Sequence, residues 1–292
     1  MKSKIISSIH RQGGSCHEFQ KNSFKSISKR LISSLLTAAF AMTGFASCTS
    51  EGNAKLQTYV LVHGAWQAPY VWNDVRKDLI RKGNQVIVVE LPGHGTDTTP
   101  PQNLNLDAYR DKVIGEISKV DGKVILVGHS MGGMVVTAVA ESIPAKISKL
   151  VYIGAFVPTS GQALGAIQDP ESQLGPALSP SRDQLTLNVK PDELTRLFIN
   201  DGSAVAKQKV IDNYRPEPII PFSNPVTVTP SNFGSVEKAY IKTLQDIVIS
   251  PRLQDQMIAS AGITEVYQLN TSHSPFLSQP KAVSDLLLKI GK

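Results

Sequence analysis

The chain has 292 residues, and its apolar and charged fractions are those of a folded globular protein with a large buried core. Its net charge of +6 lies in residues 1–47, because basic and acidic residues are equal in number from Cys48 onward. This balance excludes a basic binding surface on the remaining chain, so we expect no nucleic-acid partner.

Residues 1–47 have the order of an export signal. A basic stretch ends at Arg30, and a moderately apolar run follows that is short for a membrane span. The run ends in Phe-Ala-Ser-Cys48, which resembles the cleavage box of bacterial lipoproteins, although Phe45 stands where an aliphatic residue is usual. We therefore predict an exported bacterial protein, periplasmic or anchored to the membrane by a lipid on Cys48. Cleavage near Ala46 without lipid is the alternative.

Residues 48–56 are polar and are interpreted as a tether. The only other cysteine, Cys16, would be removed with the leader. We therefore expect no disulfide in the mature domain, and no cysteine that could act there as nucleophile or metal ligand.

From Thr58 onward, strand and helix signals alternate along the chain. Short Val/Ile/Leu runs predict strands at 58–62, 85–89, 123–127, 149–153, 238–242 and 265–269. Apolar residues at helical spacing predict helices at 71–81, 106–120, 134–140, 251–260 and 281–290. This alternation predicts an α/β domain over 57–292, with a mostly parallel sheet covered by helices on both faces.

The alternation breaks between residues 156 and 236. This stretch is rich in proline and polar residues, with helix-like pieces at 192–200 and 204–213. An insertion of this length in a compact domain is usually functional. We interpret it as a helical cap over the active site, with a passive surface insertion as the alternative.

The strand at 123–127 runs into the motif Gly128-His-Ser-Met-Gly132, and a helix follows. This is the spacing of a nucleophile elbow, in which a serine sits on a sharp strand-to-helix turn between two glycines. The helix N-terminus there offers free backbone N–H groups to developing negative charge. The pattern predicts Ser130 as a catalytic nucleophile.

A serine nucleophile needs a base, and the residues after the leader hold four histidines: His63, His94, His129 and His273. His129 precedes the nucleophile and should point away from it, while His63 and His94 follow upstream strands and suit a pocket wall. Only His273 lies downstream, in the loop between the last strand and the last helix. Because sheets of this kind impose the order Ser, acid, His, we predict His273 as the base.

The acid should follow a strand between Ser130 and His273. Asp246 comes just after the strand that ends near Lys242, and we predict that it orients the base. The other candidates are Asp255 within the next helix and Asp201 and Asp212 within the cap. A helix cap or surface turn is the alternative role for Asp246.

An oxyanion hole needs two backbone N–H groups aimed at one point. Met131 follows the nucleophile and should supply one, and Ala65 in the loop after the first strand should supply the other. The chain has no phosphate-binding glycine pattern and no cluster of residues at metal-ligand spacing. We therefore expect neither a cofactor nor a metal.

Together, these motifs resemble the α/β-hydrolase superfamily, and more narrowly the branch of plant methylesterases, plant hydroxynitrile lyases and bacterial esterase relatives. The motifs are Val-His-Gly-Ala-Trp66, Leu-Pro-Gly-His-Gly95, Gly-His-Ser-Met-Gly-Gly133, Leu-Gln-Asp246 and Ser-His-Ser-Pro-Phe-Leu-Ser-Gln-Pro280. The likeness runs from about Thr58 to Ile290. It implies Ser130, Asp246 and His273 as the triad, with Ala65 and Met131 as oxyanion donors.

Two positions depart from the lyase members of that branch. They carry lysine directly after the catalytic histidine and threonine after the first-strand histidine, where this chain has Ser274 and Gly64. The plant pattern also continues with a second His-Gly, where this chain has Gln67 and Ala68. We therefore predict a serine carboxylesterase acting on small apolar esters through an acyl-enzyme. A hydroxynitrile lyase-like C–C lyase and a non-catalytic small-molecule binder remain as alternatives.

Overall fold

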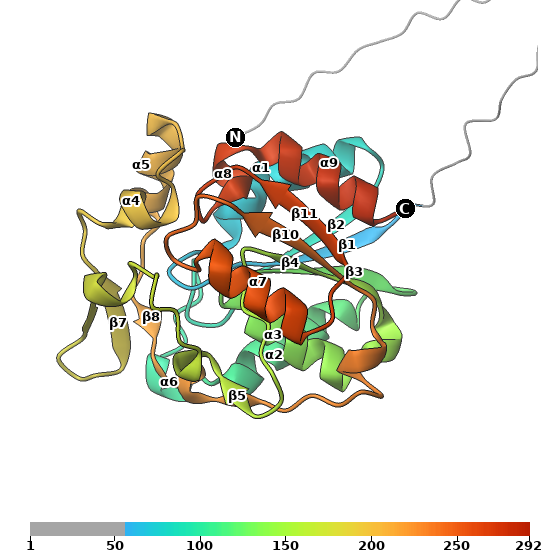
Figure 1. Cartoon of the computed structure of the whole chain (residues 1–292), viewed down its shortest axis with the longest axis horizontal. Helices are drawn as coiled ribbons and strands as arrows, with labels where there is room; N and C mark the ends of the chain where they lie inside the picture. Colours follow the sequence, from blue (N-terminus) through green and yellow to red (C-terminus); the bar gives the residue numbers. More distant parts are fainter. Residues whose placement is uncertain (1–55) are drawn as a thin grey trace, which may run out of the picture. The chain divides into compact units, whose positions relative to one another are not determined.

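The computed structural model describes residues 56–292 of the chain. The predicted export signal (1–47), Cys48 and all but the last residue of the predicted tether lie outside these residues. The described chain is built on a six-stranded sheet of order β11-β10-β4-β3-β1-β2, in which every neighbouring pair is parallel (Figure 1). Its strands are β1 (Thr58–Val62), β2 (Gln85–Val89), β3 (Val124–His129), β4 (Ile147–Ile153), β10 (Lys238–Thr243) and β11 (Glu265–Leu269).

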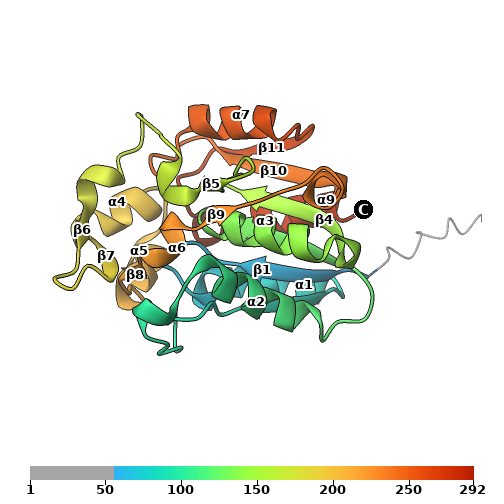
Figure 2. The same cartoon turned by 90° about the horizontal axis from the view of Figure 1, so that it is seen from below.

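Helices cover both faces of this sheet (Figures 1 and 2). One face carries α1 (Asn73–Arg81), α8 (Pro275–Ser278) and α9 (Pro280–Ile290), whose apolar residues pack on side chains from the sheet. The other face carries α2 (Leu106–Ile117), α3 (Gly132–Ser142) and α7 (Pro251–Ser260), which share a second and larger core. The sheet is therefore apolar on both faces, as continuous Val/Ile/Leu strands require.

The sequence located these elements closely. Strands β1, β2 and β11 have the predicted bounds. Strand β3 begins one residue later and ends two residues later than predicted, β4 begins two residues earlier, and β10 ends one residue later. Short 3-10 helices precede or connect several elements: η1 (Pro69–Trp72), η2 (Pro101–Asn103) and η3 (Pro144–Lys146). The predicted parallel α/β architecture is the one observed.

The central part of the segment between β4 and β10 lies beside the carboxyl ends of the strands, at the left of Figures 1 and 2, and its last residues return along the sheet to the start of β10. Helices α4 (Leu194–Phe198) and α5 (Ala204–Asp212) fall where helical pieces were predicted. The segment also contains two small antiparallel sheets, β6-β7-β8 and β5-β9, which were not predicted. The remaining elements are β5 (Gln162–Ala163), η4 (Leu164–Ala166), η5 (Gly175–Ala177), β6 (Leu178–Pro180), β7 (Thr186–Val189), β8 (Glu217–Pro218), α6 (Ile220–Ser223), β9 (Pro225–Val226) and η6 (Phe233–Ser235).

Candidate active site

Ser130 lies on a strained turn between β3 and α3. Its φ of +52° is in the left-handed region, which costs a non-glycine residue about 1–3 kcal/mol. A Cβ on Gly128 would lie 2.7 Å from Val136 Cγ2, and a Cβ on Gly132 would lie 2.7 Å from the carbonyl oxygen of His63. The close approach of α3 to β1 and β3 therefore requires both glycines. The turn places Ser130 at the N-terminus of a helix, at the carboxyl edge of the sheet.

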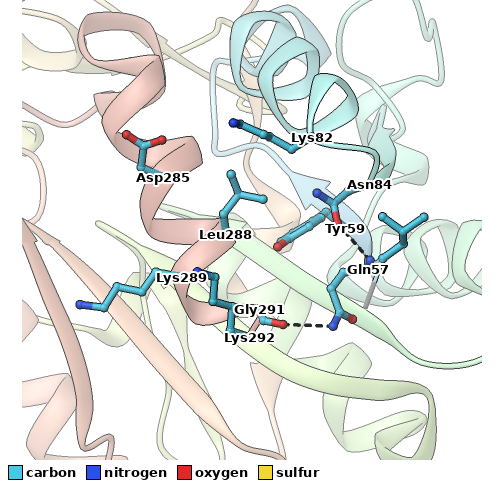
Figure 3. Close-up of a pocket in the computed structure, with 10 residues that line it drawn as sticks. Gln57, Tyr59, Lys82, Asn84, Asp285, Leu288, Lys289, Gly291 and Lys292 are labelled. Carbon is cyan, nitrogen blue, oxygen red and sulfur yellow. Dashed lines mark hydrogen bonds between the residues drawn. The ribbon is translucent and has the colours of Figure 1, made fainter. Parts of the chain in front are cut away.

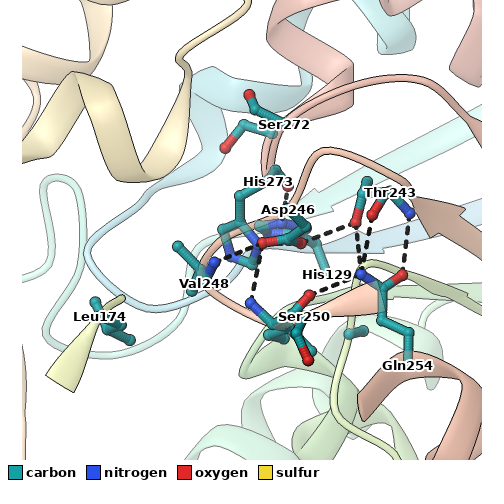
Figure 4. A network of polar contacts seen from close by, with 12 residues as sticks. His129, Leu174, Thr243, Asp246, Val248, Ser250, Gln254, Ser272 and His273 are labelled. Atoms are coloured by element: carbon teal, nitrogen blue, oxygen red, sulfur yellow. Dashed lines mark hydrogen bonds and ion pairs between the residues drawn. The ribbon is translucent and has the colours of Figure 1, made fainter. Parts of the chain in front are cut away.

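Asp246 lies in the loop after β10, and each oxygen of its carboxylate contacts two hydrogen-bonding groups (Figure 4). Its Oδ1 accepts from the backbone N–H groups of Val248 at 2.8 Å and Ile249 at 2.9 Å. Its Oδ2 accepts from the hydroxyl of Thr243 at 2.8 Å and faces His273 Nδ1 at 2.8 Å. The side chain is buried, so these four contacts fix its position.

A second layer of polar contacts holds the Asp246 loop. The buried amide of Gln254 on α7 bridges Thr243 and Ile249, accepting from Thr243 N at 3.0 Å and donating to Ile249 O at 2.8 Å. Asp169, in the segment between β4 and β10, accepts from the backbone N–H and hydroxyl of Ser250 at 2.7 and 2.8 Å. Sequence reasoning found neither residue, because an amide in a helix and an aspartate in a loop carry no local signal of this role.

His273 follows β11 in the loop that leads to α8, and it is buried. With Nδ1 bonded to Asp246, its Nε2 is the ring nitrogen left for a reacting proton. His129 donates from Nε2 to the backbone carbonyl of His273 at 2.8 Å, with the two rings 4.6 Å apart. Burial, and next the charge of His273, hold the pKa of His129 well below 6.5, so His129 stays neutral. Ser130 Oγ makes no hydrogen bond to any residue from 56 to 292.

The two predicted oxyanion donors also lie at this edge. Ala65 follows β1 in the loop next to Ser130, and a Cβ on the adjacent Gly64 would lie 2.7 Å from the Ser130 Cβ. Met131 is the first residue before α3. Within the described part of the chain, neither the Ala65 N–H nor the Met131 N–H donates a hydrogen bond. Their role as oxyanion donors stays a prediction.

The alternative acids have other partners. Asp255 pairs with Lys242 and is largely exposed, and Asp201 accepts from the hydroxyl of Ser272. Asp212 accepts from Gln208 at the end of α5. None of these carboxylates contacts His273, which leaves Asp246 as the carboxylate bonded to the predicted base.

Residues 56–292 contain neither a metal-binding cluster nor a membrane-spanning helix. No three His, Cys, Asp or Glu side chains gather there as a metal site would require. No helix in that range has the length and apolar character needed to cross a bilayer. A cavity of about 690 Å³ lies at the opposite edge of the sheet, between the start of β1 and the end of α9 (Figure 3). Its lining includes Tyr59, Asn84 and Lys289, so it is separate from the Ser130 site.

Comparison with known proteins yields a family match and a group of plant relatives. The sequence profile of the alpha/beta hydrolase family matches residues 59–286. Putative methylesterase 13, a chloroplastic protein of Arabidopsis thaliana, is 30% identical over 83% of this chain, but the match spans only 57% of that relative. Methylesterase 17 of the same plant is 29% identical over 79% of this chain and 90% of its own length.

Solved structures agree on the fold. The crystal structure of polyneuridine aldehyde esterase superposes with a TM-score of 0.72 at 22% identity, covering 82% of this chain and all of that one. A methylesterase from Arabidopsis superposes with the same TM-score at 23% identity, over 80% of this chain and 98% of its own. The resemblance stated from the sequence motifs, and the α/β-hydrolase fold class, are therefore confirmed.

The relatives correct one expectation. Methylesterases 12 and 13 are plant proteins described as chloroplastic, and methylesterase 17 is also from a plant. The prediction of a bacterial exported protein, periplasmic or anchored by a lipid on Cys48, is wrong. The physical reason is that the basic, serine-rich and acid-poor composition of residues 1–47 is shared by organelle transit peptides, so it does not identify a bacterial signal.

Proposed function

Because this chain belongs to the alpha/beta hydrolase family, we propose that it is a serine carboxylesterase that cleaves small apolar esters through an acyl-enzyme. The observation that carries the proposal is the buried Asp246–His273 pair, 2.8 Å apart, at the same sheet edge as the left-handed Ser130. The names of the relatives support ester hydrolysis over the lyase and binder alternatives, and they favour methyl esters as substrates. The chain spans little more than half of methylesterase 13, so these assignments are our proposals.

In the proposed reaction, Ser130 Oγ attacks the ester carbonyl while His273 Nε2 takes its proton. Asp246 keeps the other proton on Nδ1 and stabilises the imidazolium that forms. The N–H groups of Ala65 and Met131 stabilise the tetrahedral oxyanion. His273 then protonates the departing alcohol. A water activated by His273 Nε2 hydrolyses the acyl-enzyme, which releases the carboxylic acid product and restores Ser130.

We further propose that residues 156–236 form the cap that shapes the substrate site. Its apolar side chains support a small apolar substrate: Phe198 of α4 and Phe222 of α6 lie 5.8 and 6.0 Å from the Trp66 ring, measured between centroids. Phe198 also lies 6.0 Å from the His273 ring. An apolar wall beside the base excludes water and strengthens the electrostatic interactions inside the site.

The proposal is tested with a panel of methyl, ethyl and aryl esters, with thioesters and amides for comparison. Ser130→Ala should lower kcat by about 10⁴–10⁶ while the circular dichroism spectrum stays native. Ser142→Ala is the matched control, because this hydroxyl lies at the other end of α3 and donates to the Ala138 carbonyl. A fluorophosphonate should phosphonylate Ser130 in the wild type with loss of fluoride, which adds the mass of the phosphonyl group. Ester turnover by Ser130→Ala equal to that of the wild type would refute the proposal.

A further inference from the structure

The loop after β1, residues 63–67, is held by the segment that we propose as the cap. The backbone N–H of Trp66 donates to Glu217 Oε2 of β8 at 2.8 Å. The indole N–H of Trp66 donates to the carbonyl of Leu187 on β7 at 2.9 Å, and its ring packs against Phe198 of α4. One residue of this loop therefore contacts three separate elements of the cap.

Trp66 has a conformation that needs such support. Its φ is +57°, in the left-handed region that bulky residues rarely adopt unless their surroundings determine it. The N–H bonded to Glu217 belongs to the peptide unit that directly follows Ala65, the proposed oxyanion donor. The position of the Glu217 carboxylate thus constrains the backbone on the carboxyl side of Ala65.

Glu217 is fully buried and carries its own counter-ion. Its Oε2 also lies 2.8 Å from His94 Nε2, and His94 Nδ1 lies 3.0 Å from the carbonyl oxygen of Pro92. Because both ring nitrogens face acceptors, the contacts are those of a doubly protonated imidazolium. Burial alone would lower the pKa of His94, but the charge and hydrogen bond of Glu217 outweigh it and raise that pKa above 6.5.

The groups around this pair keep its charges in place. The His63 ring, 4.9 Å from His94, stays neutral: burial, and next the charge of His94, lower the pKa of His63 to about 3. The Tyr109 ring lies 5.5 Å from His94, and burial, followed by the charge of Glu217, raises the pKa of its hydroxyl. The positive charge of Arg215 opposes protonation of His94 but does not reverse it.

We propose that Glu217, paired with His94, is a positioning residue that holds loop 63–67 so that the Ala65 N–H faces the reacting carbonyl. This inference rests on the proposed esterase function. It gives the cap a second role, because the cap then completes the oxyanion hole in addition to enclosing the substrate. An interaction that orients an oxyanion donor acts in the transition state, so its loss lowers kcat more than it changes KM.

Glu217→Gln tests the proposal, because it keeps the shape of the side chain and removes its charge. Its matched control is Glu141→Gln. Glu141, at the far end of α3 from Ser130, also ties the core to the insertion by accepting from Thr229 N at 2.8 Å and Phe233 N at 3.1 Å. We expect Glu217→Gln to lower kcat about 10- to 100-fold with KM changed less than about threefold, and Glu141→Gln to keep kcat within about twofold.

Two further readouts separate positioning from general loss of stability. The affinity for a trifluoromethyl ketone, whose adduct carries an oxyanion, should fall in Glu217→Gln by the same factor as kcat. The wild-type kcat should also decline as pH rises through the pKa of His94, and this decline should be absent in Glu217→Gln. Equal kcat in the two glutamine variants, or unchanged ketone affinity in Glu217→Gln, would overturn the proposal.

An activity-independent measurement keeps the inference distinct from the proposed function. Amide hydrogen exchange of Trp66 should accelerate at least tenfold in Glu217→Ala, which removes the acceptor of this N–H, and stay unchanged in Glu141→Gln. If the wild type and Glu141→Gln hydrolyse no ester, the proposed function fails. A Trp66 amide that stays protected in Glu217→Ala would overturn the positioning role as well. If Glu217→Gln does not fold, Glu217→Asp carries the same comparison, because it keeps the charge and withdraws the carboxylate.

Discussion

Replacing Asp246 by asparagine tests the proposed triad most sharply, because the contacts of the carboxylate determine how the amide must sit. Oδ1 accepts from two backbone N–H groups, of Val248 and Ile249, which can only donate. The amide oxygen of asparagine must therefore take the Oδ1 position, and the NH₂ group must take the Oδ2 position facing His273 Nδ1. A donor now faces a donor, so His273 must move its proton to Nε2.

That tautomer cannot accept a proton from Ser130. We expect kcat/KM of Asp246→Asn to fall about 10³–10⁴-fold near neutral pH, which corresponds to about 4–5.5 kcal/mol of lost transition-state stabilisation. The packing should survive, because the Thr243 hydroxyl can rotate to accept from the new NH₂ group. Steady-state hydrolysis of an aryl ester, with thermal melting as the check on folding, measures both effects.

Asp255→Asn is the control, since this aspartate lies on α7 close in sequence to the acid but is exposed and pairs with Lys242. Its activity should stay within about twofold of the wild type. A folded Asp246→Asn that keeps more than about a tenth of the wild-type activity would refute the assignment of the acid. So would a loss of activity confined to Asp255→Asn.

Two further predictions concern stability. Gly132→Ala should lower the free energy of unfolding by about 1–3 kcal/mol, because its Cβ would lie 2.7 Å from a backbone oxygen. Gly115→Ala should raise the free energy of unfolding by about 0.4–1 kcal/mol, because nothing lies within 4 Å of the new Cβ on an exposed helix face. Urea unfolding of both variants measures the two changes, and changes of equal sign would contradict the packing argument. The pKa of His94 is raised on folding, so the contribution of its pair with Glu217 is complete below about pH 6.5 and is lost as pH rises through the folded-state pKa. The difference in unfolding free energy between wild type and His94→Gln should therefore shrink as pH rises above about 6.5, and a difference that grows instead would contradict the charged pair.

The sheet and the candidate triad were readable from the sequence because their signals are local. Each strand is a short run of consecutive apolar residues bounded by turn residues, and such a run predicts a strand that is buried on both faces. Ser130 is identified by its two flanking glycines, and His273 by being the single histidine downstream of it. The structure brings Ser130, Asp246 and His273 to one edge of the sheet, while their catalytic roles stay predictions.

The parts that sequence reasoning missed depend on contacts between distant residues. Glu217 lies between two prolines in the insertion, and nothing near it in the chain indicates a partnership with Trp66, 151 residues away. His94 was interpreted as part of a pocket wall, and it instead belongs to a buried ion pair whose partner comes from that insertion. The strands β6, β7 and β8 have only two to four residues each, too few for an alternating pattern to emerge.

Each of these distant contacts links a loop of the candidate site to the insertion between β4 and β10. Glu217 holds the loop that carries Ala65, and Asp169 holds Ser250 beside the Asp246 loop. Asp201 accepts from Ser272, directly before His273. The segment that we propose as the cap therefore also bonds all three loops of the candidate site. Changes in this insertion that adapt the pocket to a new ester should alter kcat together with KM, because substrate fit and catalytic geometry depend on the same backbone.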